Sequence, residues 1–177
     1  MKKYFLILSA MVITTIVYAQ ESTSPPVEDF PNYHPLVVHF PLVLLIVAAI
    51  MQFGVLIFKS KAYNYAVTAL TVVGFLSGLL AAFIFHAHPS HNISAQAHHI
   101  FETHEKFAFA TLWISGIASV FKIASLFTYR KWLEIVSLLL LLACATTVSI
   151  AGHHGSELVY KQGIGPKGEK LENEHEH

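Results

Sequence analysis

Four long apolar segments constrain what this chain can fold into more than any other feature of its sequence. The first is residues 36–58, which carry no charged side chain and are long enough as a helix to cross the roughly 30 Å hydrocarbon core of a bilayer. Of the 177 residues, 54% are apolar and only 12% are charged, unlike a water-soluble domain. This pattern predicts an all-α fold, a four-helix transmembrane bundle, with spans at about 35–58, 62–86, 104–129 and 132–152.

The segment before the first span has the pattern of a secretory leader. Residues 1–19 begin with two lysines, continue with an apolar stretch and end on small residues at Val17-Tyr18-Ala19, which predicts a signal peptide. An uncleaved anchor helix is the alternative. Residues 20–33 are rich in serine, proline and acidic residues, which favours a periplasmic linker.

Two further segments complete the predicted organisation. The loop between spans two and three, residues 87–103, is expected to contain a short periplasmic helix. Residues 161–177 are polar and charged, and we expect them to form a disordered tail. The predicted membrane domain is therefore residues 34–160.

The positions of the basic residues predict the orientation of the bundle. Lys59 and Lys61 follow span one, and Arg130 and Lys131 follow span three, so these two turns are expected in the cytoplasm. A secretory start independently places residues 20–33 outside. The predicted location is the bacterial inner membrane, in contact with the lipid bilayer, with both termini on the periplasmic side.

Six of the 12 histidines lie at the predicted periplasmic ends of the spans. They are His34 and His39 at the start of span one, His86 at the end of span two, His104 at the start of span three, and His153 and His154 at the end of span four. An ionisable side chain at such a position is costly unless it has a partner, which makes these residues candidates for a site. One such histidine alone is typical of an ordinary membrane interface, whereas a shared end for all of them indicates convergence.

Small and polar residues recur along one face of three spans, which permits close helix contact. The stripes are Gly74, Gly78, Ala82 and His86 in span two; His104, Ala108, Thr111, Ser115 and Ala118 in span three; and Thr146, Ser149 and His153 in span four. Each stripe ends in a histidine, so each is expected to turn that histidine toward the other helices.

Imidazole is a ligand for haem iron, copper and zinc, and four-helix bundles hold cofactors between facing helices. The sequence has no Cys-x-x-Cys-His motif, which excludes covalently attached haem. We therefore predict b-type haem for membrane electron transfer, with His39, His104, His153 and His34 as candidate ligands. One alternative is copper or zinc, bound by the same four residues and His86. Another is a cofactor-free scaffold subunit, in which the histidines respond to pH.

Other classes of function have less support. A net charge of zero argues against a nucleic-acid surface. The sequence contains no Ser/His/Asp order, Walker loop or HExxH motif, so a stand-alone enzyme has no motif to support it. The lone cysteine, Cys144, lies in an apolar run and is expected to be a small packing residue. Lys122, inside span three, is expected to extend its ammonium to the near membrane interface.

Two motifs resemble those of a known family. HPLVVHFPLVLL, beginning at His34, is similar to an opening signature HPLLVHFPIAL, and GHHGSELVYKQGIG, beginning at Gly152, is similar to a closing signature GHLGGxLVHG or GGELVYxHG. His104 matches a histidine that opens the third helix of that family. The family contains small bacterial four-helix membrane proteins and is catalogued as domain of unknown function 2231. The resemblance covers roughly residues 33–165.

The resemblance implies which positions correspond to the family's motif residues. They are His34, His39, His104, Gly152, His153, Gly155, Glu157 and Tyr160. This sequence departs from the family motif at Ser156, where the family often has a second glycine, and at Gln162, where some members have histidine. We therefore do not expect a further ligand in the tail. Relatives are often joined to cytochrome c-like domains, which implies a periplasmic cytochrome or another redox protein as a partner by association only.

Overall fold

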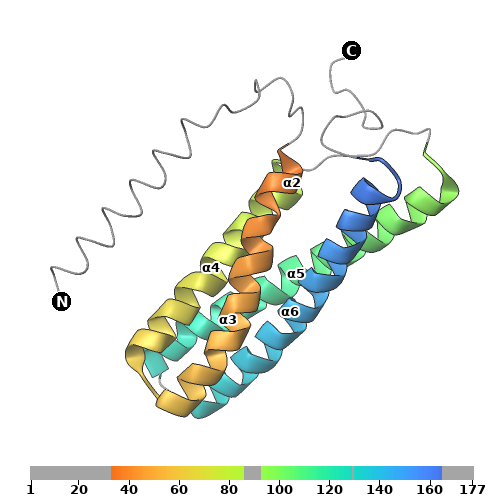
Figure 1. Ribbon diagram of the computed structural model, residues 1–177. Helices are drawn as coiled ribbons and strands as arrows, with labels where there is room; N and C mark the ends of the chain where they lie inside the picture. Colours follow the sequence, from red (N-terminus) through yellow and green to blue (C-terminus); the bar gives the residue numbers. More distant parts are fainter. Residues whose placement is uncertain (1–32, 86–92, 129, 165–177) are drawn as a thin grey trace, which may run out of the picture. The chain divides into compact units, whose positions relative to one another are not determined.

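The computed structural model of the protein describes residues 33–85, 93–128 and 130–164 (Figure 1). In these residues the regular elements are helices: α2 (His34–Val37), α3 (His39–Phe58), α4 (Lys61–Phe83), α5 (Ala95–Thr128) and α6 (Lys131–Tyr160). The predicted signal peptide, nearly all of the predicted linker, His86 and most of the predicted tail lie outside the described residues.

The predicted spans are confirmed as four helical segments that are long and apolar enough to cross a membrane. The first of them, His34–Phe58, combines α2 and α3. Pro35 lies at the start of α2 and Pro41 in the first turn of α3, where a missing backbone N–H costs little. Val38 between them keeps helical dihedral angles, with φ −64° and ψ −18°, so the chain continues in nearly the same direction.

The helices form two antiparallel pairs, α3 with α4 and α5 with α6, and α3 also packs on α6 and α4 on α5 (Figure 1). We call the end that holds residues 59–60 and 130 the turn end, and the opposite end the histidine end. The two pairs lie close together at the turn end and diverge toward the histidine end (Figure 1).

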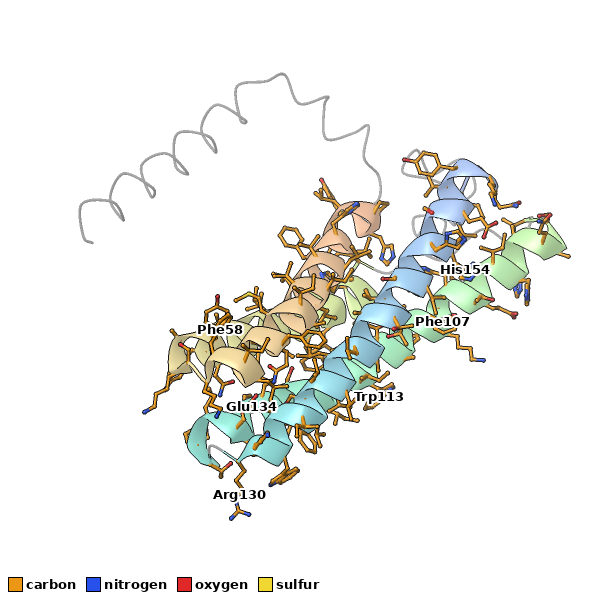
Figure 2. The ribbon with its side chains drawn as sticks, turned by 60° about the horizontal axis from the view of Figure 1, so that its bottom comes forward. Phe58, Phe107, Trp113, Arg130, Glu134 and His154 are labelled. Atoms are coloured by element: carbon orange, nitrogen blue, oxygen red, sulfur yellow. The ribbon has the colours of Figure 1, made fainter. Side chains whose placement is uncertain are left out.

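Apolar side chains occupy both the inside and the outside of the bundle. The inside holds a cluster of mostly small residues: Ala48, Ala49, Val55, Val67, Ala118 and Leu141. Cys144 is fully buried and is confirmed as a packing residue. Large apolar side chains such as Trp113 and Phe58, which are 74% and 63% exposed, point outward (Figure 2). An apolar surface of this kind is suited to contact with lipid. The helices also satisfy their own backbone hydrogen bonds, as the interior of a bilayer requires.

Two helices are longer than the sequence predicts, and the separate short helix expected within residues 87–103 is wrong for the described part of that loop. Residues from Ala95 onward already belong to α5, and α6 continues to Tyr160 instead of ending near residue 152. Ser94 caps α5, because its Oγ accepts a hydrogen bond from the N–H of Ala97 at 3.1 Å. Hydropathy placed the start of α5 too late and the end of α6 too early because the additional turns contain histidines and charged residues.

The additional turns of α5 and α6 stabilise each other through a small apolar cluster of Ala97, Ile100, Leu158 and Ile164. Gly163, with φ 67°, adopts the left-handed conformation just after α6, and the N–H of Ile164 then donates to the carbonyl of Leu158 at 3.0 Å. The chain thus folds back after α6, and Ile164 packs on Leu158 in the last turn of the helix.

Replacing Gly163 with alanine is expected to destabilise this helix end. A side chain in the left-handed region costs about 1 kcal/mol, so the free energy of unfolding should fall by about that amount. Thermal denaturation in detergent measures the change, with the exposed Ser156→Ala as a control. An unchanged midpoint would contradict the role given to Gly163.

Candidate functional site

A cavity of about 470 Å³ lies at the histidine end, between all four long helices. Its size is within the range of roughly 300–1,000 Å³ that is usual for small-molecule and cofactor sites. Small residues line three of the helices: Gly74, Gly78 and Ala82 on α4, Ala108, Thr111 and Ser115 on α5, and Gly152, Gly155 and Ser156 on α6. The predicted stripes on spans two and three are therefore confirmed as facing the interior, apart from His86, which lies outside the described residues.

The stripe predicted on span four is wrong, because α6 is rotated so that it faces outward. The exposed residues are Thr146, Ser149 and His153. The inward face is formed instead by the buried residues Cys144, Val148 and Ala151. Thr147 is the hydroxyl that reaches a neighbouring helix, where it accepts a hydrogen bond from Thr111 at 2.8 Å. Span four is apolar on all sides, so its sequence does not reveal which face packs inward.

Two of the predicted ligands, His34 and His104, face each other across the cavity. They lie on different helix pairs, and their ring centroids are 6.3 Å apart with an interplanar angle of 78°. Nδ1 of His34 is 3.2 Å from the carbonyl oxygen of Ala81, and Nδ1 of His104 is 2.8 Å from that of Ala151. A carbonyl oxygen can only accept, so Nδ1 donates in both rings and Nε2 is the nitrogen with the lone pair.

Gly155 allows the His104 ring to lie against α6. A Cβ atom at this position would be 3.2 Å from both Cε1 and Nδ1 of His104, closer than an ordinary van der Waals contact. The glycine of the closing motif therefore determines where the imidazole can sit.

The other predicted ligands are not brought into this pair. His39 lines the cavity, but it is exposed, and its Nδ1 is 2.6 Å from the carbonyl oxygen of Pro35 in the preceding turn. His153 is exposed and is not among the residues that line the cavity. Its neighbour His154 is half-buried and lies 3.4 Å from a carboxylate oxygen of Glu157 (Figure 2). In the part of the chain that the structure describes, no three His, Cys, Asp or Glu residues are placed to hold a metal ion.

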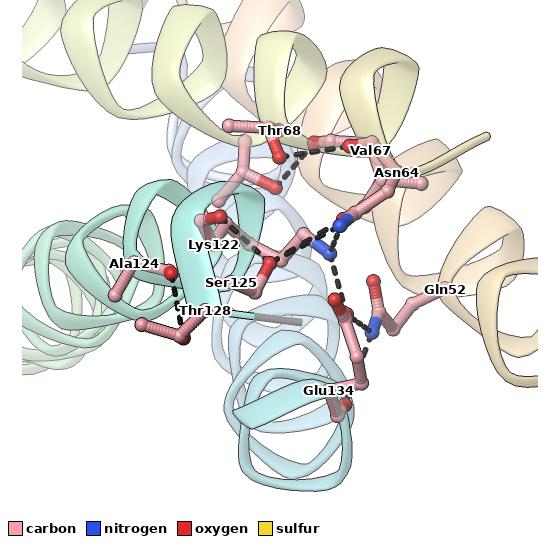
Figure 3. A network of polar contacts seen from close by, with 10 residues as sticks. Gln52, Asn64, Val67, Thr68, Lys122, Ala124, Ser125, Thr128 and Glu134 are labelled. Atoms are coloured by element: carbon pink, nitrogen blue, oxygen red, sulfur yellow. Dashed lines mark hydrogen bonds and ion pairs between the residues drawn. The ribbon is translucent and has the colours of Figure 1, made fainter. Parts of the chain in front are cut away.

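A second polar feature lies near the turn end, and sequence analysis missed it. We call Gln52, Asn64, Lys122, Ser125 and Glu134 the Lys122 cluster; together they come from all four long helices. The expected extension of Lys122 to the interface is wrong: its side chain is fully buried, and Nζ lies 2.8 Å from Oε2 of Glu134. Figure 3 shows the ammonium between Asn64 and Glu134, donating a hydrogen bond to each.

The remaining contacts of the cluster connect the two helix pairs. Gln52 on α3 donates from Nε2 to the side chain of Glu134 at 2.8 Å and to its backbone carbonyl at 3.0 Å. Asn64 on α4 donates to Ser125 on α5 at 3.3 Å. The signal that could have found the cluster is that Gln52 and Glu134 are polar residues inside apolar spans, where polar residues usually face a partner.

Four long apolar helices around a cavity and a buried ion pair define a multi-pass membrane protein. The sequence model of the family described as "Predicted membrane protein (DUF2231)" matches residues 31–168. The chain belongs to that family, which confirms the resemblance of its two motifs. No curated protein and no solved structure matches the chain.

Proposed function

We propose that this protein binds b-type haem in the cavity at the histidine end, with His34 and His104 as its two axial ligands. The observation that carries the proposal is the facing pair of imidazoles, each with Nδ1 directed at a backbone carbonyl. Carbonyl acceptors of this kind orient metal-binding histidines and select the tautomer that places the lone pair on Nε2.

The separation of the two rings supports this assignment. Two imidazoles that bind one metal on opposite sides, with metal–nitrogen distances of about 2 Å, have centroids roughly 6 Å apart. The centroids of His34 and His104 are 6.3 Å apart. The wall of small and apolar residues from all four helices suits a flat apolar macrocycle, as in cofactor-binding helix bundles.

The number of available ligands favours haem over a bare metal ion. A porphyrin occupies four positions around its iron, so two histidines complete the coordination. A zinc site needs at least three protein ligands, and the described residues offer no such group. Bound haem supplies one-electron redox chemistry, while the protein orients it and excludes water.

The orientation proposed from the sequence gives this site a direction. Lys59, Lys61, Arg130 and Lys131 lie at the turn end, which the positive-inside rule assigns to the cytoplasm. In a bacterial inner membrane, the histidine end then faces the periplasm. A periplasmic redox protein is the partner that fits a haem at this end.

A haem titration of the purified protein, followed by the absorption spectrum, tests the proposal. The wild type should develop the Soret and α bands of a low-spin bis-histidine haem. His34→Ala and His104→Ala should each weaken haem binding roughly tenfold or more, since each removes one axial ligand. The exposed residues His153 and His99 provide matched alanine controls that should behave as the wild type.

Two results would overturn the assignment. One is a wild-type spectrum identical to that of free haem in the same detergent. The other is binding that survives both single substitutions unchanged. Elemental analysis of the same preparation distinguishes copper or zinc from iron.

A further inference from the structure

The Lys122 cluster contains hydrogen-bonding groups that the described residues do not satisfy. An ammonium has three N–H donors, and Lys122 uses two of them, on Asn64 and Glu134. Oε1 of Gln52 and Oγ of Ser137, which lies one turn beyond Glu134 on α6, are buried without a hydrogen-bond partner among the described residues. Both residues are fully buried. Buried polar groups in this state are usually satisfied by ordered water, which accepts from N–H and donates to oxygen.

A line of buried polar side chains connects this cluster with the cavity. Bonding of Asn64 to Ser125, together with the close approaches of Phe75 to Gly116 and Gly78 to Leu112, sets the register of α4 against α5. In this register Thr68 lies opposite Lys122, and Thr71 lies opposite Ser119. Toward the histidine end the line continues through Ser115 and Thr111, which line the cavity. We call Thr68, Thr71, Thr111, Ser115 and Ser119 the hydroxyl track; all five are buried.

The hydroxyl groups of the track are arranged so that they can still accept hydrogen bonds. Thr68, Thr71 and Ser119 each donate to the carbonyl four residues earlier in their own helix, at 2.8, 2.7 and 2.8 Å. Their oxygen lone pairs stay available. Residues four apart are about 6 Å apart along a helix, so one water between successive hydroxyls completes a chain of hydrogen bonds.

The cluster also has a partly exposed side, at Glu134 in the first turn of α6. The side chain of Glu134 is 12% exposed, whereas that of Lys122 is fully buried. A proton can therefore reach the carboxylate from the turn end, and the ammonium is the group that faces the track. A charged pair inside a membrane span costs free energy, and ionisable residues in such a position are candidates for a functional site.

We propose that the Lys122 cluster and the hydroxyl track form a proton path between the turn end and the cavity. Glu134 takes a proton from solvent while Lys122 releases one to the neighbouring water, and the pair stays neutral overall. Glu134 then passes its proton to Lys122. For the transfer, each hydroxyl turns its O–H from the backbone carbonyl to the next water, accepts one proton from the water behind it and releases its own. One proton moves and no electron is exchanged.

Proton flux into vesicles tests this path without any haem. The protein is reconstituted into phosphatidylethanolamine–phosphatidylglycerol vesicles that contain potassium and a pH-sensitive dye, and valinomycin then sets a membrane potential. The wild type should acidify the vesicles several-fold faster than protein-free vesicles. Ser119→Ala, which interrupts the track, and the double variant Lys122→Met/Glu134→Gln, which leaves no unpaired charge, should both return the rate close to that background.

Ser149→Ala is the matched control, because this hydroxyl also donates to a carbonyl of its own helix but is exposed on the outside of α6. Its flux should equal that of the wild type. If the double variant fails to fold by circular dichroism, Ser119→Ala alone decides. Wild-type flux at the level of empty vesicles, or unchanged flux in Ser119→Ala, would show that the hydroxyls only pack the helices and would overturn the proposal. Haem binding is measured separately and does not affect this result.

Discussion

Glu134→Ala is expected to produce the largest loss of stability of any single substitution considered for this protein. It leaves the ammonium of Lys122, which is fully buried, without its carboxylate, and it removes the side-chain acceptor of Gln52. Breaking a buried ion pair by deleting one partner costs about 3–5 kcal/mol, and the partial exposure of Glu134 places the effect near the lower value. The measurement is chemical or thermal denaturation in detergent.

The two members of the pair should respond unequally. Lys122→Met should cost less than Glu134→Ala, because the carboxylate that remains is partly exposed and keeps its hydrogen bond from Gln52. The double variant Lys122→Met/Glu134→Gln should recover most of the loss, since uncharged replacements of a buried pair are often neutral. Glu102→Ala is the control: it removes an exposed contact with His98, which is worth less than about 1 kcal/mol. Equal effects for Glu134→Ala and Glu102→Ala would contradict the buried charge pair.

Gly155→Ala is expected to have the largest effect on binding at the proposed haem site of any substitution that leaves both histidines in place. The new Cβ would lie 3.2 Å from two atoms of the His104 ring, so the ring must shift away from its 2.8 Å contact with the carbonyl of Ala151. Disturbing the group that orients a metal-binding histidine lowers affinity by about 10–100-fold. Haem titration of the variant measures this loss.

Gly78→Ala is the matched control for this experiment. It lines the same cavity, but its Cβ would make ordinary contacts, 3.4 Å to Leu112 and 3.8 Å to Pro41. Both substitutions favour the helix by about 1 kcal/mol, so a difference in haem affinity between the two variants does not arise from general helix stability. Haem affinity in Gly78→Ala should stay close to that of the wild type. The same loss in both variants would show that Gly155 has no special relation to His104.

The fold was largely predictable because membrane spans depend on length and apolarity, which are local properties of the chain. Each of the four spans was located. The start of α5 was placed too late and the end of α6 too early, since hydropathy does not reveal that Ala97 and Leu158 belong to one cluster beyond the apolar part. The inward face of α5 was predicted correctly because its small and polar residues lie on one side of the helix and its large apolar residues on the other.

The candidate site was only partly predictable. Grouping the histidines at one end identified His34 and His104, but it could not separate them from His39 and His153, which are exposed. Whether a helical residue faces the interior depends on rotation about the axis, and neighbouring residues differ by about 100°. His153 and His154 are adjacent, so the sequence pattern of an apolar helix does not decide which of them turns inward.

The amino-acid sequence by itself determined the class of the protein, its four crossings and the end at which its histidines gather, since these depend on the order of apolar and polar residues along the chain. Only the tertiary structure decided that His34 meets His104, that α6 turns Ser149 outward, and that Lys122 is buried against Glu134. The physical reason is that each of these depends on the rotation and register of one helix against another. Those are set by side-chain packing summed over the whole bundle, and no local pattern contains that sum.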